Sequence, residues 1–506
     1  MKAIKNAKLI CAVLALVMTL SFFAACAETN GEGASDITTM DPANAAVTTG
    51  GDPEVTYVSD DLPELDFKGE DIVILARTRD LVEDEIVVDD ENGLIINDAV
   101  YKRNELVNRR LNVEIKMQGV DGTATYVVHD ALKIMIDTGA YDVDLVANLA
   151  YVTASTTASG LVRNLRGIST LDLTKPYWSQ GLNEAMRVGD SQYIISGAAL
   201  LSYYRFTFVT FFNVDMFENS GIPSLYDTVE SGDWTIEKQI EYTKLLFKDN
   251  NGNGESDKGD VFGFMSNHNM IGVDAYWASC ELPILTQNAD GFYEYSLDIE
   301  RTVKTAELLT QLFWDTEGTM RIPQTTGDTE QDEIAQRFAS EEAAMVTLRL
   351  IEVENDLLGM SNYGIVPVPR LDSEQATYRS AIHDSFTTFS IPNFNFSEEE
   401  LEMLGAVLEV MGSQSFSTIT PAYYEQALKG RYANDPQSVR MLDLITQNVW
   451  IDAGVLYCNA IDKPHQMMRT IVGNNASNIS SQLSAKARIV TKQVAALNTE
   501  LEKLLG

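Results

Sequence analysis

The chain has 506 residues, 45% of them apolar, and carries a formal net charge of −37. A chain of this length is expected to divide into more than one lobe, each with its own hydrophobic core. Its acidity argues against nucleic acid as a partner, because phosphates require Lys and Arg, and it makes polyanionic ligands unexpected, although a local pocket can differ from the net charge.

The N-terminus has the pattern of a signal peptide over residues 1–25. A positively charged start precedes an uncharged run, Leu9 to Ala25, which is shorter than the about 20 residues that a membrane-spanning helix needs. The stretch FAAC that ends at Cys26 resembles a bacterial lipobox, which implies cleavage before Cys26 and lipidation of its thiol. Cleavage at an A-x-A site, which would release the protein, and retention as an uncleaved anchor are the alternatives.

The segment 26–62 is rich in Ala, Gly, Thr, Asp and Glu and poor in large apolar residues. Such a segment buries too little surface to offset the entropy lost on ordering, so we expect a disordered tether between a lipid anchor and a folded body.

The first part of the body has the pattern of a strand, a helix and a strand. Residues 71–76 form a short apolar strand candidate, and Asn97 and Asp98 are predicted to cap the following helix. Residues 111–117 then alternate apolar and polar side chains, as a half-buried strand does. A helix over 131–137 and a buried strand over 141–149 continue the alternation, which predicts an α/β fold with a parallel sheet.

The segment 249–260 follows most of the spacing of an EF-hand calcium loop, with Asp260 at the twelfth position in place of Glu. A helix capped by Thr235 precedes it, but the sequence VFGF after it predicts a strand and not a second helix, so an EF-hand sensor is not expected. We expect a stand-alone structural Ca²⁺ site whose ligands are Asp249, Asn251, Asn253, Glu255 (through its carbonyl), Asp257 and Asp260. A turn rich in Gly and Asn that binds no ion is the alternative.

Near the C-terminus, apolar residues from Leu483 to Leu504 recur at 4,3 spacing. We expect a terminal helix that packs on the body, with a coiled coil to a partner as the alternative. Cys280 and Cys458 are the cysteines of the body, and two buried thiols are expected rather than a disulfide. The four histidines are scattered, and HExxH, CxxC, GxSxG and P-loop motifs are absent from the sequence, so no enzyme is predicted.

Several stretches, in this order, together resemble the extracellular solute-binding proteins of family 1, the carbohydrate-uptake lipoproteins of ABC transporters found in Clostridia and relatives. They are INDAVYKRNELVNRRLNVEI (96–115), GAYDVDLV (139–146), LDLTKPYW (171–178), QYIISGAALL (192–201), FFNVDMFENSGI (211–222), YDTVESGDWTIEKQ (226–239), YGIVPVPRLDSEQATYRS (363–380) and PAYYEQALKGRYANDPQSVRMLDLI (421–445).

This resemblance implies a two-lobe, periplasmic-binding-protein-like fold with a hinge and an interlobe cleft. Lobe one would hold 63–198 plus 382–430, and lobe two 206–376 plus 431–506. The chain would cross between lobes near 196–205 and near 376–383. Trp178 and Trp234 are expected to brace the structure.

Sugar binding needs aromatic faces and planar polar groups. Clefts in open α/β sheets lie beyond the carboxyl ends of strands, which points to Asn148 and Tyr151. The resemblance adds candidates at the crossings and after the predicted calcium loop: Tyr203, Tyr204, Arg205, Tyr276, Trp277, Arg349, His383 and Asp384. The alternatives are core packing for the aromatic residues, a hinge pair for His383 and Asp384, and an interlobe salt bridge for Arg205.

The resemblance implies a monomeric, lipid-anchored protein on the extracellular face of the cell membrane. It would capture a saccharide, with an oligosaccharide favoured by the size of the body, and deliver it to the permease subunits of an ABC transporter. A carbohydrate-active enzyme, a binding module for peptides and a sensor component are the alternatives; with 74 acidic residues, carboxylate pairs suited to a glycosidase can arise by chance.

Overall fold

The computed structural model describes residues 57–78, 82–254, 256–257, 259–323, 329–427 and 436–505. The predicted signal peptide, Cys26, most of the tether and Glu255 lie outside these residues. Val55–Gly506 forms one unit by its internal contacts, and it is described by itself.

The first sheet has the strand order β12-β3-β1-β2. β1 runs parallel to β2 and β3, whereas β12 returns antiparallel to β3. Its strands are β1 (Glu70–Thr78), β2 (Val113–Asp121), β3 (Leu145–Leu149) and β12 (Thr387–Ser390). The βαβ unit and the α/β class predicted from periodicity are therefore confirmed.

Two local predictions in this region are wrong. The helix α2 (Ile95–Leu111) begins before Asn97, and the carboxylate of Asp98 accepts hydrogen bonds from the backbone N–H groups of Asn92 and Gly93, so it fixes the preceding loop. At the other end, Leu111 closes the helix because Asn112 adopts a left-handed conformation with φ of 51°, and the strand starts only at Val113.

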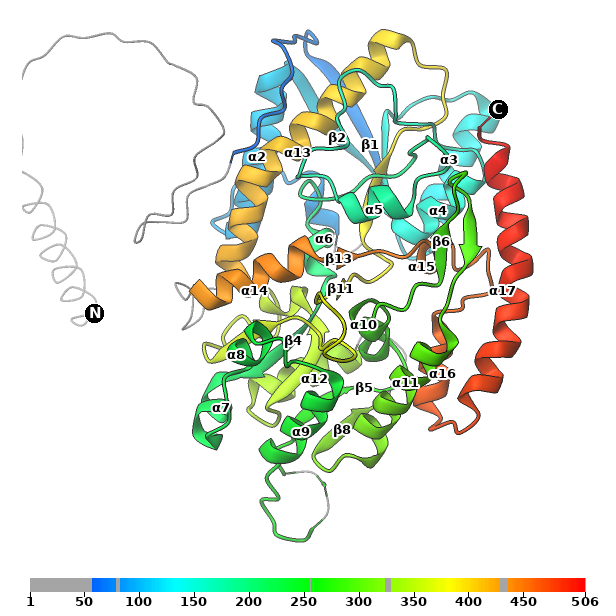
Figure 1. Cartoon of the computed structure of the whole chain (residues 1–506). Coiled ribbons are helices and arrows are strands. Elements are labelled where there is room, and N and C mark those ends of the chain that lie inside the picture. Colours follow the sequence, from blue (N-terminus) through cyan, green and yellow to red (C-terminus); the bar gives the residue numbers. More distant parts are fainter. Residues whose placement is uncertain are drawn as a thin grey trace, which may run out of the picture. The chain divides into compact units, whose positions relative to one another are not determined.

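Helices cover the first sheet, and the longest of them packs along α2 (Figure 1). Apolar residues of β1 and β2 meet those of this long helix in a separate hydrophobic cluster. The elements of this region are η1 (Glu83–Glu85), α2, α3 (Val127–Thr138), α4 (Ala150–Ala158), α5 (Gln180–Ala185), α6 (Ser202–Arg205) and α13 (Glu398–Ala427).

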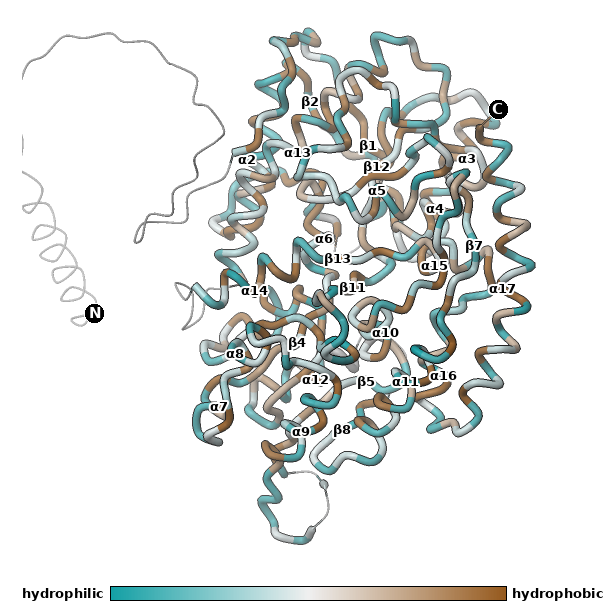
Figure 2. Tube along the Cα trace, viewed as in Figure 1, coloured by the Kyte–Doolittle hydropathy of each residue, from teal (hydrophilic) through white to brown (hydrophobic). Residues whose placement is uncertain are grey.

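The second sheet has the order β10-β4-β9-β5-β8. β4 is antiparallel to β10 and β9, and β5 is parallel to β9 and β8. Its strands are β4 (Phe208–Asn213), β5 (Phe264–Asn267), β8 (Thr319–Ile322), β9 (Met345–Arg349) and β10 (Tyr363–Val366). Every residue of β4, β5, β9 and β10 is buried, and Figure 2 shows the hydrophobic colouring gathered around β4.

Short helices surround the second sheet. The predicted cap on α9 is confirmed, since the Thr235 hydroxyl accepts a hydrogen bond from the backbone N–H of Lys238. The elements are α7 (Val214–Ser220), α8 (Leu225–Glu230), α9 (Ile236–Leu246), α10 (Ile271–Ser279), α11 (Ile299–Thr310), the π-helical turn η2 (Gln311–Asp315), α12 (Thr329–Ala339) and η3 (Leu350–Val353).

Three described segments lie where the regions of the two sheets meet. Thr207 pairs with Ile382, and β11 (Ser380–Ala381) runs parallel to β13 (Val449–Trp450). The resemblance implied crossings near 196–205 and 376–383 and, from its lobe bounds, at 430–431, which lies outside the described residues. It implied none at β13. A hairpin of β6 (Leu285–Gln287) and β7 (Tyr293–Tyr295) lies beside them.

The C-terminal part consists of α14 (Pro436–Gln447), α15 (Ala453–Leu456), α16 (Gln466–Gly473) and α17 (Ile479–Glu502). α17 contacts β7, α11 and α4, and Figure 1 shows it running along one side. Its stripe residues Leu483, Val490, Val494, Leu497 and Leu501 are buried in the main hydrophobic cluster. The expectation of a terminal helix packed on the body is therefore confirmed.

Both tryptophans expected to brace the structure are buried. The Trp234 indole donates to the Pro367 carbonyl at 2.8 Å, and the Trp178 indole donates to Glu409 on α13 at 3.3 Å. Among the helices of the described ranges, none combines the length and the apolar character needed to cross a membrane.

Candidate functional site

A cavity of about 50 Å³ lies where the connecting segments meet α10 and the C-terminal part. Phe208 at the start of β4 and Phe386 just before β12 both contribute to its wall, so segments leading to both sheets line it. The other aromatic and charged or titratable lining residues are Trp277, Trp450, Asp274, His383, Asp384, Asp452 and His465.

Three predicted ligand residues line this cavity: Trp277, His383 and Asp384. Trp277 is set by α10, and its indole N–H donates to the carbonyl of His465 at 2.7 Å. His383 and Asp384 occupy the connection between β11 and β12, where the backbone N–H of His383 donates to the Phe206 carbonyl at 2.9 Å. This backbone hydrogen bond therefore joins two of the connecting segments at the cavity wall.

Asn148 and Tyr151 lie beneath this connection, at the carboxyl end of β3. The backbone N–H of Tyr151 donates to the carbonyl of Asp384 at 3.3 Å, and that of Ala150 donates to Phe386 at 2.9 Å. Asn148 is buried, and its side-chain oxygen has no hydrogen-bond partner. Neither Asn148 nor Tyr151 is among the residues that line the cavity.

Three predicted tyrosines are buried with their hydroxyls used inside the protein, and they do not line the cavity. Tyr203 donates to Ser179 at 3.2 Å, and Tyr276 donates to Gln239 at 2.8 Å. The Tyr204 hydroxyl lies 2.6 Å from the hydroxyl of Thr420. The structure therefore places these side chains in packing positions.

Arg205 is buried and joins the two sheet regions through ion pairs. Its guanidinium lies 2.6 Å from Asp84, before α2, and 2.8 Å from Glu354, after η3. Burial alone would lower the pKa of Arg205, but the two carboxylates raise it. The salt bridge weighed as the alternative to ligand binding is therefore present.

Arg349 at the end of β9 is also buried, with its guanidinium carbon 5.2 Å from the centre of the Phe206 ring. It is not a cavity-lining residue. Its charge nevertheless acts on the site. Burial lowers the pKa of His383 well below its usual value, and the positive charge of Arg349 lowers it further.

The titratable groups at the cavity are strongly perturbed. Burial raises the pKa of Asp384 to about 6, with a further contribution from Asp274, and burial lowers the pKa of His465 to about 3. The imidazoles of His383 and His465 are therefore neutral at pH 7. Asp274 is paired with Arg469, whose Nε donates to it at 2.8 Å, so its charge is compensated within the wall.

Among the titratable and tryptophan side chains that line the cavity, four were not predicted: Asp274, Trp450, Asp452 and His465. Asp452 is a structural group, since its carboxylate accepts from the backbone N–H groups of Ile284, Leu285 and Gly454. Trp450, Asp452 and His465 belong to the third crossing and its continuation. In the sequence, a single His and a single Trp without a surrounding motif do not indicate that these residues reach the cavity.

The predicted calcium loop satisfies its own polar groups. The Asp249 carboxylate accepts from the backbone N–H groups of Gly252 at 2.6 Å and Gly254 at 2.8 Å, while Asn251 and Asn253 donate to Asp257 at 2.9 and 2.6 Å. The two Asp260 oxygens accept from the backbone N–H groups of Asn250 and Asp257. After the loop the chain enters β5, but this strand begins only at Phe264, the last residue of the predicted strand VFGF, while Val261 and Phe262 form isolated bridges. Calcium binding remains a prediction.

No family model matches the sequence, and no curated protein matches it. Among solved structures, an ABC transporter solute-binding protein from Thermotoga lettingae bound with α-D-tagatose has a TM-score of 0.52 at 13% identity, over 84% of this chain and 100% of that one. A maltose/maltodextrin-binding domain from Bdellovibrio bacteriovorus bound to maltotriose gives 0.51 at 13%, over 84% and 99%.

The galacto-N-biose/lacto-N-biose I-binding protein of an ABC transporter from Bifidobacterium longum, in complex with lacto-N-biose, gives a TM-score of 0.53 at 12% identity, over 85% of this chain and 98% of that one. Almost the whole length of each of these proteins is matched. The chain therefore has the two-lobe, periplasmic-binding-protein-like fold that the resemblance implied.

Proposed function

We propose that the protein captures a carbohydrate in the cleft between its lobes and does not act as an enzyme. The observation that carries this proposal is the cavity at the crossings, where the Trp277 and Trp450 rings adjoin Asp384 and His465. Flat aromatic faces pack against the C–H surfaces of a sugar ring, and carboxylate and imidazole groups hydrogen-bond its hydroxyls. The structurally similar proteins named above hold tagatose, maltotriose and lacto-N-biose.

Several polar groups in this region are available to a ligand. The Nδ1 atoms of His383 and His465 are buried and have no hydrogen-bond partner. A buried polar atom without a partner costs about 1–3 kcal/mol, and a sugar hydroxyl that reached it would recover part of that cost. By contrast, the Asp452 and Asp274 carboxylates already bind backbone amides and Arg469.

The size of the cavity implies that the lobes separate to admit a ligand. At about 50 Å³ it is well below the roughly 300 Å³ at which small-molecule sites begin. The crossings at 207, 382 and 449–450 are the narrow connections about which such a movement would occur. A sugar would then favour one arrangement of the lobes only through its differential affinity for that arrangement.

We further propose that Cys26 carries a lipid, that the protein acts on the extracellular face of the membrane, and that it delivers its ligand to an ABC permease. The lipobox-like FAAC sequence and the acidic tether that follows it support the first two parts. The fold supports the third, because binding proteins of ABC transporters share it.

Isothermal titration calorimetry of the full chain with tagatose, maltotriose and lacto-N-biose tests the proposal. We expect Trp450→Ala to weaken binding of the accepted sugar by about tenfold, or ~1.4 kcal/mol. Trp314→Ala is the matched control, because the Trp314 indole donates to the Val472 carbonyl outside the cavity. Binding that neither substitution alters would place the ligand elsewhere, and chromatography that detected sugar products would favour the enzyme.

A further inference from the structure

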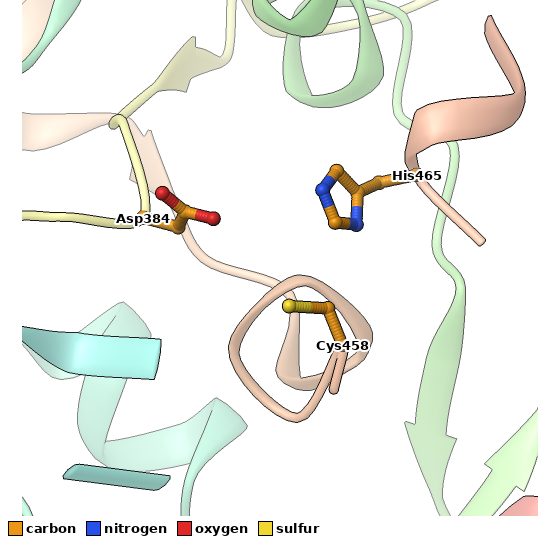
Figure 3. Close-up of side chains that lie close together, drawn as sticks. All are labelled: Asp384, Cys458 and His465. Atoms are coloured by element: carbon orange, nitrogen blue, oxygen red, sulfur yellow. The ribbon is translucent and has the colours of Figure 1, made fainter. Parts of the chain in front are cut away.

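We infer that Asp384, Cys458 and His465 form a binding site for a transition-metal dication of the Zn²⁺ class. Among the described residues, one potential ligand atom from each of these side chains lies within 4.8 Å of the other two. Figure 3 shows the three side chains around a common space, with Asp384 on the connection between β11 and β12 and with Cys458 and His465 on the C-terminal part. This inference does not rest on the proposed carbohydrate function.

The set of ligand atoms selects the class of ion. A thiolate, an imidazole and a carboxylate are the ligands that Zn²⁺ and related ions accept, whereas Ca²⁺ and Mg²⁺ prefer oxygen alone. In a tetrahedral zinc site the ligand atoms lie about 3.3–3.6 Å apart, as follows from metal–ligand distances of about 2.0–2.3 Å. The ligand atoms would therefore draw together by at most about 1.5 Å when the ion binds.

His465 provides an independent indication that a ligand belongs here. Its side chain is only 3% exposed, and its Nδ1 atom has no hydrogen-bond partner. The backbone around it is held firmly, because its carbonyl accepts the Trp277 indole N–H at 2.7 Å. A buried imidazole nitrogen without a hydrogen-bond partner is free to coordinate a metal ion.

The chain between the other two ligands is also fixed. The Cys458 carbonyl accepts from the backbone N–H of Lys463 at 2.8 Å, and Asp462 and Lys463 have positive φ values of 62° and 51°. This tight turn brings His465 back toward Cys458. On the third side, the Ser385 hydroxyl donates to the Asp384 carboxylate at 3.3 Å and helps to orient it.

The charges around the cluster are compatible with a dication. One thiolate, one carboxylate and a neutral imidazole would make the occupied centre neutral, which reduces the cost of burying the ion. The Arg469 charge is compensated by Asp274, and Lys486 is paired with Asp462 at 2.6 Å. Lys463 is a further charged side chain that acts on Asp384, Cys458 and His465. Because Asp384 and His465 also line the cavity, a fourth position would be open to water or to a ligand oxygen.

Co²⁺ titration of the full chain tests the site directly, because a cobalt–thiolate bond gives a charge-transfer band that other ligands do not. We expect one such band per bound ion, displaced by Zn²⁺. Cys458→Ser should abolish it and weaken Zn²⁺ binding, measured against a chromogenic chelator, by about 100-fold or more. Cys280→Ser is the matched control, because Cys280 is equally buried but lies outside the cluster.

His465→Gln should also weaken Zn²⁺ binding, whereas His129→Gln should not. Absence of the band in the wild-type chain would overturn the inference whether or not any variant folds. A band that persists in Cys458→Ser, or that disappears equally in Cys280→Ser, would also overturn it. Cys458→Ser should leave sugar binding unchanged, because Cys458 does not line the cavity whereas Asp384 and His465 do, so this variant keeps the two proposals separate.

Discussion

Glu409 on α13 provides a prediction about the pH dependence of stability. Its side chain is 1% exposed and accepts hydrogen bonds from the Tyr177 hydroxyl at 2.5 Å, the Trp178 indole at 3.3 Å and the Asp172 backbone N–H at 3.1 Å. These contacts tie the 172–178 loop to the helix. Burial, partly offset by the three hydrogen bonds, raises the pKa of Glu409 to about 7 from its ordinary value of 4.5.

A carboxyl group whose pKa is higher in the folded state binds more protons there than in the unfolded state. Its contribution to stability is therefore fully present below pH 4.5, the unfolded value, and is lost as the pH rises through about 7. The difference of roughly 2.5 pKa values corresponds to about 3 kcal/mol.

The assay is urea unfolding of the full chain at pH 4.5 and pH 8. We expect Glu409→Gln to remove about 3 kcal/mol of the pH-dependent change in unfolding free energy between these values. The loss of a well-placed acceptor lowers stability equally at both pH values, so it does not affect the comparison. Glu399→Gln, at an exposed position in the first turn of the same helix, is the control. Equal pH dependence in Glu409→Gln and wild type would refute the reasoning.

Two further predictions concern the connection between lobes and the acidic loop. Arg205→Met leaves Asp84 and Glu354 without their cation, and we expect it to lower the unfolding free energy by about 3 kcal/mol, measured by urea unfolding. Lys133→Met, which breaks an exposed ion pair, is the control. A loss of stability in Arg205→Met no larger than that in Lys133→Met would contradict this prediction. Calcium at ~1 mM is expected to stabilise the full chain by about 2.7 kcal/mol if its Kd is ~10 μM. EDTA should reverse this stabilisation and Asp257→Asn should reduce it. A melting temperature that calcium does not change would show that the loop 249–260 is a turn that binds no ion.

Local patterns predicted the fold class well, because β1 contains a continuous buried run, whereas the start of β2 and the helix before it bury one face. The capping role assigned to Asp98 failed, because its partners Asn92 and Gly93 belong to a loop with no pattern of its own. The order of family-like stretches carried the two-lobe architecture, which periodicity alone does not specify.

The candidate site was predicted only in part. Trp277, His383 and Asp384 were found because they follow family-like stretches, and all three line the cavity. Trp450 and His465 were missed because they reach the cavity through a third crossing beyond the last such stretch. Whether a tyrosine near a crossing faces a ligand depends on distant partners, such as Thr420 for Tyr204, and the sequence does not reveal these.

The central claim is that a sugar changes the arrangement of two lobes that meet at the cavity. Spin labels at Ile134→Cys on α3 and Leu245→Cys on α9, both exposed and on different lobes, report that arrangement through pulsed electron resonance, while Cys280 and Cys458 are buried. We predict that an accepted sugar shifts the distance distribution between the labels and is recovered unchanged. A distribution that no sugar in the panel alters, or a sugar converted to products, would contradict the account.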